Sequence, residues 1–303
     1  MERIGVVTIT YNSSDVLLPF LDCLKEQTYS NFLLYIVDNA SIDGTLDILE
    51  KYSDIQIVVI KNKFNLGVAR ANNQGIQRAL EDDCTQIMLM NNDVEFESGL
   101  IFKLMKSQNE NSCSIVTPKM LYYDQPDKIW YAGSWFNKSK GYLPVHRGMG
   151  EIDVGQFDKL LAVEYSPTCC CLIKKEVFYD IGFMNESYFV YFDDTDFFYR
   201  VYKDQRHKIF YYPFVSFFHK IGSLTKSFVN EGGRNYRGDF FLQQNTINHV
   251  YFLKQIGGLF AYLFIFWLFF KNNIQFVIRS NIKKSFAVWL LINKSYFKGL
   301  LKK

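Results

Sequence analysis

The run Gln86-Ile87-Met88-Leu89-Met90 is followed directly by Asn91-Asn92-Asp93. A short apolar run that ends in polar residues predicts a strand buried on both faces of a sheet. Four further runs of this kind occur in the first part of the chain, at Ile4–Thr10, Leu33–Val37, Ile55–Ile60 and Ser114–Thr117. The alternation of such strands with helices would make the fold α/β.

Helical patterns fill the intervals between these strands. They cover Asp15–Glu26, with Ser14 as the expected N-cap, and Thr45–Tyr52, Val68–Leu80 and Glu97–Gln108. Repeated β-α units of this size predict a mainly parallel sheet with right-handed crossovers. Ligands of such sheets bind beyond the carboxyl ends of the strands, so Tyr11, Asp38 and Asp93 should gather on one edge.

The ends of the first two strands suit a nucleotide base. In Thr10-Tyr11-Asn12 the Tyr11 ring can stack on a base, although a plain strand end with a capping Asn12 is the alternative. Asp38 can accept hydrogen bonds from a base or ribose. Asp43, before Gly44 and Thr45, is expected to be structural, as a cap for the second helix.

Asn65-Leu66-Gly67 precedes the third helix, whose N-terminus can receive a phosphate. Gly67 can equally be only a helix cap. The sequence contains neither G-x-G-x-x-G nor G-x-x-x-x-G-K-[ST], which disfavours a dinucleotide-binding fold and a P-loop.

Two acidic clusters can carry chemistry. Asp93 can hold a hard divalent ion against a diphosphate, with a polar turn as the simpler interpretation. Asp193-Asp194-Thr195-Asp196 opens a helix expected over Asp194–Lys203, where carboxylates complement the helix dipole. Three carboxylates in four residues exceed what capping needs, and neighbouring like charges raise a pKa toward that of a general base.

The C-terminal part has an unusual charge distribution. The chain has 303 residues and a net charge of +3, yet no acidic residue follows Asp239, whereas nine basic residues do. Ile256–Phe270 is an uninterrupted apolar run of fifteen residues. A basic, aromatic, helical tail predicts attachment to an anionic membrane surface rather than binding to nucleic acid. A packing or dimer helix and a spanning helix are the alternatives.

Two features bear on the compartment. The six cysteines show no C-x-x-C spacing, which favours reduced thiols. No signal peptide is expected, because Met1-Glu2-Arg3 leads straight into an apolar strand.

In order along the chain, these pieces resemble the inverting family 2 glycosyltransferases of the GT-A fold. The motifs that carry the resemblance, over residues 4–225, are Thr10-Tyr11-Asn12, Val37-Asp38-Asn39-Ala40-Ser41, Asn65-Leu66-Gly67, Met90-Asn91-Asn92-Asp93, Asp193-Asp194-Thr195-Asp196 with Arg200, and His219-x-x-Gly222-x-Ser223. Asn91-Asn92-Asp93, Pro118-Lys119 and Ile129-Trp130-Tyr131-Ala132-Gly133 are most similar to the bacterial rhamnosyltransferase branch.

The resemblance implies a nucleotide-sugar donor, dTDP-L-rhamnose above all, and Mg²⁺ or Mn²⁺. It assigns the donor to Thr10, Tyr11, Asn12, Asp38, Asn65, Gly67, Asn92 and Asp93. The metal would be held by Asp93 and His219, and the sugar or acceptor by Trp130, Gly133 and Asp196. Asp194 would be the general base, with Asp193 supporting it or exchanging roles.

Three positions depart from the family pattern. Asn91 replaces the first Asp of the usual Asp-x-Asp motif, which leaves fewer carboxylates for a metal. Asp193 stands where the family usually has Glu. Asn39 replaces a carboxylate that in relatives reads uracil, which fits a different base.

The expected organisation is a GT-A domain over 1–237 and a helical, membrane-associating tail over 238–303. Within the domain, 1–118 would bind the donor and 119–237 would carry the acceptor site and the base. The expected reaction is inverting transfer to a saccharide on a polyprenyl diphosphate, at the cytoplasmic face of the plasma membrane, with a homodimer left open. The alternatives are a hexosyl- or galactofuranosyltransferase that uses a UDP-sugar, a sugar-1-phosphate nucleotidyltransferase, and a non-catalytic donor-binding scaffold. A nucleotidyltransferase would need a Gly-rich, basic loop after the first strand, and this sequence has none there.

Overall fold

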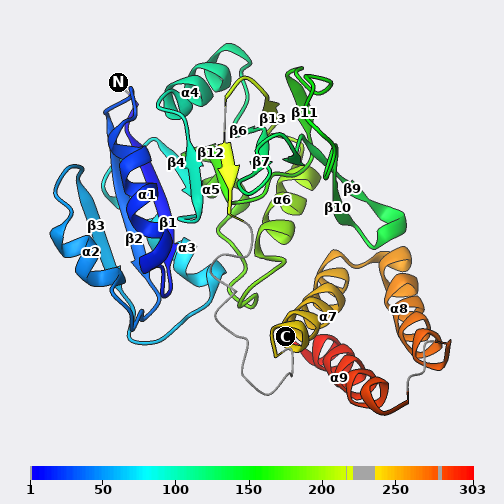
Figure 1. Cartoon of the computed structure of the whole chain (residues 1–303). Helices are drawn as coiled ribbons and strands as arrows, with labels where there is room; N and C mark the ends of the chain where they lie inside the picture. The colour runs from blue at the N-terminus through cyan, green and yellow to red at the C-terminus, as the bar shows by residue number, and fades with distance from the viewer. Residues whose placement is uncertain (1, 216, 221–235, 279–281) are drawn as a thin grey trace. The chain divides into compact units, whose positions relative to one another are not determined.

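The computed structural model describes residues 2–215, 217–220, 236–278 and 282–303, which belong to two compact units. The first unit is α/β and is built around an eight-stranded sheet of order β11-β13-β6-β12-β4-β1-β2-β3 (Figure 1). The expected α/β class and mainly parallel sheet flanked by helices are confirmed.

The first half of the chain supplies the elements that the sequence predicts and one further strand, β5. They are β1 (Ile4–Thr10), α1 (Ser14–Lys25), β2 (Phe32–Asp38), α2 (Thr45–Lys51), β3 (Ile57–Lys61), α3 (Val68–Glu81), β4 (Gln86–Met90), β5 (Val94–Phe96), α4 (Leu100–Glu110) and β6 (Ile115–Pro118). β1 pairs in parallel with β2 and β4, and β2 pairs in parallel with β3. All residues of β4 are buried, as expected for an apolar strand at the centre of a covered sheet.

Two helix starts in this half of the chain differ from the expectation. α1 begins at Ser14 itself, so Ser14 is not its N-cap; the preceding Ser13 accepts hydrogen bonds from Tyr11 and Asn92 instead. α4 begins at Leu100 rather than Glu97, because Glu97 lies in the turn and its carbonyl oxygen accepts the Leu100 N–H.

The second half of the chain completes this unit with shorter elements. They are β7 (Met120–Tyr122), β8 (Ile129–Tyr131), β9 (Ser134–Asn137), the 3₁₀ turn η1 (Lys138–Lys140), β10 (Leu143–His146), β11 (Leu161–Val163), β12 (Cys170–Lys174), α5 (Lys175–Ile181), α6 (Asp193–Asp204), β13 (Ile209–Tyr212) and β14 (Phe217–His219). β12 runs antiparallel to β4 and β6, so the segment before Cys170 meets the carboxyl end of β4. A second sheet has the order β5-β14-β7-β8.

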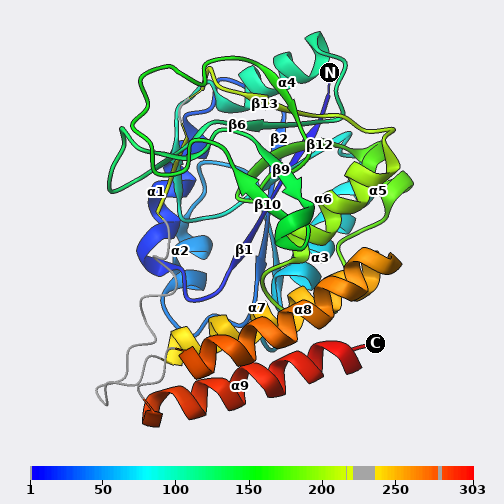
Figure 2. The ribbon, with the colours of Figure 1, turned by 90° about the vertical axis from the view of Figure 1, so that its right-hand side faces the viewer.

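The second unit contains α7 (Tyr236–Ile256), α8 (Gly258–Ile278) and α9 (Ile282–Leu301), each of which contacts the other two (Figure 2). The short segments Asn137–Leu143 and Val190–Phe192 belong to the same unit. Val250, Leu253, Ala261 and Ile265 form part of its apolar core. The expected C-terminal helical, aromatic-rich region is confirmed.

The apolar run Ile256–Phe270 is not one helix. Gly257 and Gly258 have φ angles of 66° and 79°, so α7 ends at Ile256 and α8 begins at Gly258. Glycine takes this left-handed conformation without a steric cost, which explains the break. Among the described residues, no helix has the length and hydropathy needed to span a bilayer.

Candidate active site

The carboxyl ends of β1, β2 and β4, called here the carboxyl edge, bring the predicted donor residues together. Thr10 lies opposite Asp38 in the β1–β2 register. The Thr10 hydroxyl donates to Asp38 Oδ1 at 2.8 Å, and the Ser41 amide donates to Oδ2 at 3.0 Å. Asp38 is therefore a buried carboxylate held in one orientation by its neighbours.

Asn12 fixes the loops beyond this pair. Its backbone amide donates to the Ser41 hydroxyl, and its side-chain oxygen accepts the Ile42 amide. Asp43 accepts hydrogen bonds from the amides of Thr45 and Ser14, so its role is structural as expected. The N-cap of α2 is Gly44, however, and not Asp43. Between these loops, the Tyr11 side chain is 39% exposed, which leaves ring surface for a base to stack on.

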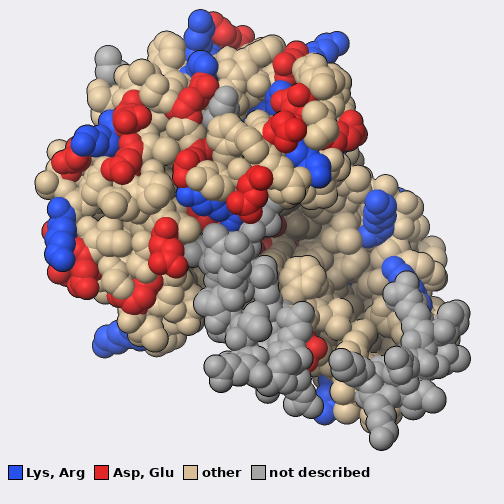
Figure 3. Space-filling model, viewed as in Figure 1, with Lys and Arg blue, Asp and Glu red and all other residues tan. Residues whose placement is uncertain are grey.

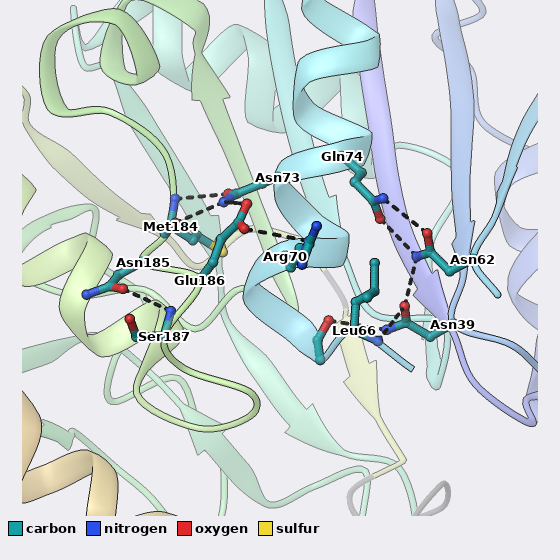
Figure 4. Close-up of polar contacts among 11 residues, drawn as sticks. Asn39, Asn62, Leu66, Arg70, Asn73, Gln74, Met184, Asn185, Glu186 and Ser187 are labelled. Atoms are coloured by element: carbon teal, nitrogen blue, oxygen red, sulfur yellow. Dashed lines mark hydrogen bonds and ion pairs between the residues drawn. The ribbon is translucent and has the colours of Figure 1, made fainter. Parts of the chain in front are cut away.

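Asn39 organises the loop before α3 (Figure 4). Its side chain is buried, donates to the Gly67 carbonyl, and accepts hydrogen bonds from Asn62 and the Leu66 amide. Asn65 caps the same turn by accepting the Gly67 amide. Because both the amide nitrogen and the oxygen of its side chain form hydrogen bonds within the protein, Asn39 holds this loop in place.

Gly67 makes a close approach to the segment that leads to the second acidic cluster. Its φ is 84°, and a Cβ there would lie 2.4 Å from the Phe189 carbonyl oxygen. That oxygen also accepts the Val68 amide, the first N–H of α3. The phosphate expected at this helix N-terminus would therefore have to use other donors than Val68.

Asp93 and His219 meet because β5 begins immediately after Asp93 and pairs antiparallel with β14. His219 lies opposite Val94 in this register, and its Nε2 is 3.4 Å from Asp93 Oδ1. The Lys220 amide donates to the Asp93 carbonyl oxygen. Asn92 ties this corner to β1 by donating to the Ile9 carbonyl and the Ser13 hydroxyl.

This pair offers a carboxylate and an imidazole to a divalent ion. The Nδ1 atom of His219 is buried and has no hydrogen-bond partner among the described residues. The described residues contain no group of three or more His, Cys, Asp or Glu side chains that could hold a metal. A two-residue donor set fits an ion that keeps waters and bridges phosphates, as Mg²⁺ and Mn²⁺ do.

The second acidic cluster lies in the first turn of α6, where Asp193, Asp194 and Asp196 are all in place. Asp194 Oδ1 accepts the Thr195 amide at 2.6 Å and the Thr195 hydroxyl at 3.2 Å. Asp194 Oδ2 accepts the Tyr165 hydroxyl at 2.5 Å. A carboxylate has about four lone-pair sites, so these three bonds leave Oδ2 able to accept one more proton donor.

The environment of both carboxyl groups favours a base. Burial raises the pKa of Asp193, and the neighbouring charge of Asp194 raises it further. Burial also raises the pKa of Asp194, against the hydrogen bonds from Tyr165 and Thr195. A carboxylate whose pKa lies above its usual range is a better proton acceptor near neutral pH.

A series of ring contacts connects the two acidic sites. Trp130 lies edge-on to His219 at 4.9 Å and to His146 at 5.3 Å, and His146 stacks on Tyr165 at 5.9 Å between ring centroids. Tyr165 in turn holds Asp194. The structure thus brings Asp93, His219, Trp130 and Asp194 into one connected array.

Two predicted sugar or acceptor residues, Asp196 and Gly133, have close contacts within the protein. Asp196 pairs with the Arg200 guanidinium at 2.9 Å, and Arg200 donates to the carbonyls of Ile181 and Phe183. Gly133 has a φ of 99°, and a Cβ there would lie 3.1 Å from Val163. Both residues shape the surroundings of the site.

Sequence reasoning missed Tyr165, His146 and Asn73. Tyr165 precedes β12, whose antiparallel direction returns the chain to the carboxyl edge. Asn73, on α3, exchanges two hydrogen bonds with the backbone of Met184 and donates to Glu186 (Figure 4). Asn73 stands in the motif Asn72-Asn73-Gln74-Gly75, and the signal in the sequence was this polar run inside a helical pattern. The structure buries Asn73.

The comparison with known structures supports the fold. The mannosyltransferase PcManGT from Pyrobaculum calidifontis, solved with GDP-Man and Mn²⁺, superposes with a TM-score of 0.57 at 13% identity, over 99% of this chain and 88% of that one. At this identity the likeness shows a common GT-A-like fold.

Two curated proteins are similar in sequence. The Escherichia coli UDP-Glc:alpha-D-GlcNAc-diphosphoundecaprenol beta-1,3-glucosyltransferase WfaP is 34% identical over 79 residues, which is 26% of this chain and 32% of that protein. The Shigella flexneri dTDP-rhamnosyl transferase RfbF is 26% identical over 196 residues, which is 64% of this chain and 62% of that protein. The chain thus matches less than two thirds of either relative.

The family model described as glycosyl transferase family 2 matches residues 5–182, which is more than half of the chain. This match covers the carboxyl edge with Asp38 and Asp93, and the antiparallel strand β12 that brings Tyr165 to it. The chain therefore belongs to glycosyltransferase family 2.

Proposed function

We propose that this chain transfers a 6-deoxyhexose or hexose, with inversion, from a nucleotide-sugar donor to a saccharide on a polyprenyl diphosphate. The observation that carries the proposal is the ring array from Asp93 and His219 to Tyr165 and Asp194. It supports a leaving-group site and a general base within one site, which is what group transfer to a hydroxyl needs.

In the proposed reaction, Asp194 takes the proton of the acceptor hydroxyl. The hydroxyl oxygen attacks the anomeric carbon from the face opposite the diphosphate, and the bond from that carbon to the diphosphate oxygen breaks. Asp193 is buried beside Asp194, whose charge raises the pKa of the Asp193 carboxyl, and it would support Asp194 or exchange roles with it. A bound Mg²⁺ or Mn²⁺, held by Asp93 and His219, would supply charge neutralisation for the diphosphate.

On the donor side, we propose that Tyr11 stacks on the base and that Asp38, fixed by Thr10 and Ser41, accepts hydrogen bonds from it or from the ribose. Asn12, Asn65, Gly67 and Asn92 would shape the loops around the diphosphate through their hydrogen bonds and the close contact of Gly67 with Phe189. Trp130, beside His219, would present its ring to the transferred sugar or the acceptor.

We propose dTDP-L-rhamnose as the donor to test first. The motif resemblance and the similarity to a dTDP-rhamnosyl transferase support this choice. Asn39 supports it too, because it replaces the carboxylate that reads uracil in relatives and its side chain binds the loop before α3. The competing donor is a UDP-sugar, as the name of the Escherichia coli relative suggests.

The first experiment measures donor binding by thermal shift with Mn²⁺ or Mg²⁺, using dTDP-rhamnose, UDP-glucose, UDP-galactose and GDP-mannose. We expect a metal-dependent rise with one donor, since a ligand at a hundredfold excess over its Kd stabilises by about 2.7 kcal/mol. The matched variant Asp93→Ala should lose this rise. A shift with UDP-glucose alone would replace rhamnose, and no shift with any donor would favour the non-catalytic scaffold.

The second experiment measures transfer. The selected donor is incubated with a short-chain polyprenyl-diphosphate-linked GlcNAc, and the product is identified by mass and by the anomeric coupling in its NMR spectrum. We expect the anomeric configuration opposite to that of the donor. Retention of configuration would overturn the inverting mechanism.

A membrane surface is the partner we propose for the second unit. One side of α8 contributes Ala261, Phe264 and Ile265 to the unit's core, while another side is exposed. The exposed large apolar residues there include Leu259, Tyr262, Leu263, Phe266, Trp267 and Phe270. Lys271 lies over the Trp267 ring at 4.8 Å, a pairing suited to the interface of an anionic bilayer.

The charge distribution supports the same partner. After Asp239 all nine charged residues are basic, whereas acidic and basic side chains are interspersed on the visible face of the first unit (Figure 3). Basic residues next to an anionic surface add to the attraction of buried aromatic rings. We therefore propose peripheral attachment to the cytoplasmic face, where nucleotide sugars and the carrier lipid meet.

Co-sedimentation with vesicles tests this attachment. Phosphatidylglycerol vesicles should retain the protein and phosphatidylcholine vesicles should retain much less. The double variant Phe266→Ser with Trp267→Ser should be released, while Phe64→Ser, an equally exposed ring in the first unit, should stay bound. Equal retention of all variants would refute the proposal, and concentration-dependent self-association without lipid would instead assign the α8 surface to a second copy.

A further inference from the structure

The three residues before the acidic pair, Val190–Phe192, belong to the second unit, and two of them have an unusual backbone. Tyr191 and Phe192 have φ angles of 64° and 69°, in the left-handed region that residues with a Cβ rarely occupy. Asp193 follows Phe192 directly. Such conformations persist where the surroundings fix them, and they are frequent at functional sites.

Asn248 of α7 is the polar group that fixes this segment. Its side chain is fully buried, and Nδ2 donates to the carbonyl oxygens of Val190 at 2.9 Å and of Tyr191 at 3.0 Å. Lys302 Nζ donates to Asn248 Oδ1 at 3.0 Å. Because a lysine ammonium can only donate, this contact sets the orientation of the amide and directs both its N–H groups at the two carbonyls.

Aromatic contacts from α7 hold the side chains of the same segment. Phe192 packs against His249 at 5.4 Å and Phe252 at 5.7 Å, and Tyr191 packs edge-on to Phe241 at 5.1 Å between ring centroids. His249 is itself fixed by a hydrogen bond with the Gly141 carbonyl. Backbone and side chains of residues 190–192 are therefore both held from α7.

We propose that Asn248 is a positioning residue for the acidic pair Asp193 and Asp194. The two carbonyl contacts restrict the dihedral angles at Tyr191 and Phe192, and Phe192 is joined directly to Asp193, the first residue of α6. The carboxylates stand on the first two residues of that helix. The functional meaning rests on the proposed role of Asp194 as base, whereas the structural effect can be measured without it.

Hydrogen exchange on the intact protein tests the structural part. Asn248→Asp keeps the size of the side chain and its contact with Lys302, but it has no N–H to donate and turns a carboxylate toward two carbonyls. The control is Asn245→Asp, on the same helix, where the amide donates to the Phe241 carbonyl of its own helix. It introduces the same charge about one turn away.

We expect peptides covering residues 190–196 to exchange at least tenfold faster in Asn248→Asp, with residues 4–38 unchanged, and no change in Asn245→Asp. If Asn248→Asp does not fold, Asn248→Ala removes the donors without adding a charge and should show the same local increase. Unchanged exchange at 190–196 in a folded Asn248 variant would overturn the proposal.

Kinetics then test the functional part in the full chain. With the donor found by thermal shift, Asn248→Asp should lower kcat about a hundredfold, as expected for a small displacement of a reacting group. Donor Kd should change less than twofold, since the donor residues lie on other elements.

A parallel loss of donor binding and thermal stability would show a merely structural role, and an unchanged kcat would also overturn the proposal. Absence of turnover in the unmodified protein would count against the proposed function, and the exchange result would still decide the inference.

Discussion

The carboxyl edge and the segment before α6 hold their carboxylates by different means. Asp38 and Asp93 follow parallel strands, so backbone register and short polar contacts set their positions. Asp193 and Asp194 follow an irregular loop, residues 182–192, held by side chains from distant parts of the chain. Arg200, Asn73 and Asn248 bind carbonyls along it, and Tyr165 binds Asp194 itself. Carboxylates at strand ends are positioned mainly by the backbone register of the sheet. Carboxylates that follow an irregular loop depend on individual side-chain hydrogen bonds.

The largest expected effect separates catalysis from donor binding. Asp194→Asn removes the proton acceptor and should lower kcat by about a thousandfold, within the range of general base catalysis. Donor affinity, measured by calorimetry, should stay within twofold. Asp93→Ala is the opposite control, because it should weaken metal-dependent donor binding. Full turnover by Asp194→Asn would remove Asp194 as the base.

Asp193→Asn should lower kcat about a hundredfold if the Asp193 carboxyl supports Asp194 as the base, and it should also raise the melting temperature. Its pKa is raised by burial, so the folded state holds the proton more tightly than the unfolded state. The carboxyl therefore destabilises the fold at a pH above that raised pKa, and the effect fades as the pH falls toward the unfolded value. Melting curves at acidic and alkaline pH measure this difference. An equal rise in the melting temperature of Asp193→Asn at both pH values would contradict a buried charge on Asp193.

Tyr165→Phe should have a smaller effect on the same carboxylate. It removes the hydrogen bond that lowers the pKa of Asp194, so the acid limb of the kcat profile should move to higher pH. We expect kcat at neutral pH to fall about tenfold, consistent with a displaced base. Tyr202→Phe, at a half-buried tyrosine of α6, is the control. A profile that falls in height without moving would indicate a loss of packing alone.

The smallest effect is expected at the carboxyl edge. Thr10→Val removes one of the hydrogen bonds to Asp38 but leaves both from Ser41. Donor Kd should rise about threefold, because a lost hydrogen bond to a charged group is partly compensated by the rest. Titration calorimetry measures it, with Thr8→Val as the control on the same strand. If Thr10→Val weakened donor binding as much as Asp93→Ala does, the carboxyl edge would also depend on individual side-chain hydrogen bonds.

Much of the first half was readable from the sequence. The strands β1, β2 and β4 and the position of Asp38 and Asp93 at one edge follow from apolar runs that end in polar residues. The start of α1 and the break at Gly257 and Gly258 were not, because caps and left-handed glycines depend on local hydrogen bonds that composition does not specify.

Sequence by itself determined the α/β alternation, the family motifs and the acidic residues available for chemistry, because burial periodicity and local helix preferences are properties of neighbouring residues. Only the tertiary structure decided which of them meet. The antiparallel direction of β12 brought Tyr165 to Asp194, and the β5–β14 pairing brought His219 to Asp93. Asn248 reached the backbone before Asp193 from 58 residues away in the chain. Contacts over such separations depend on strand direction and helix packing, which no local pattern encodes.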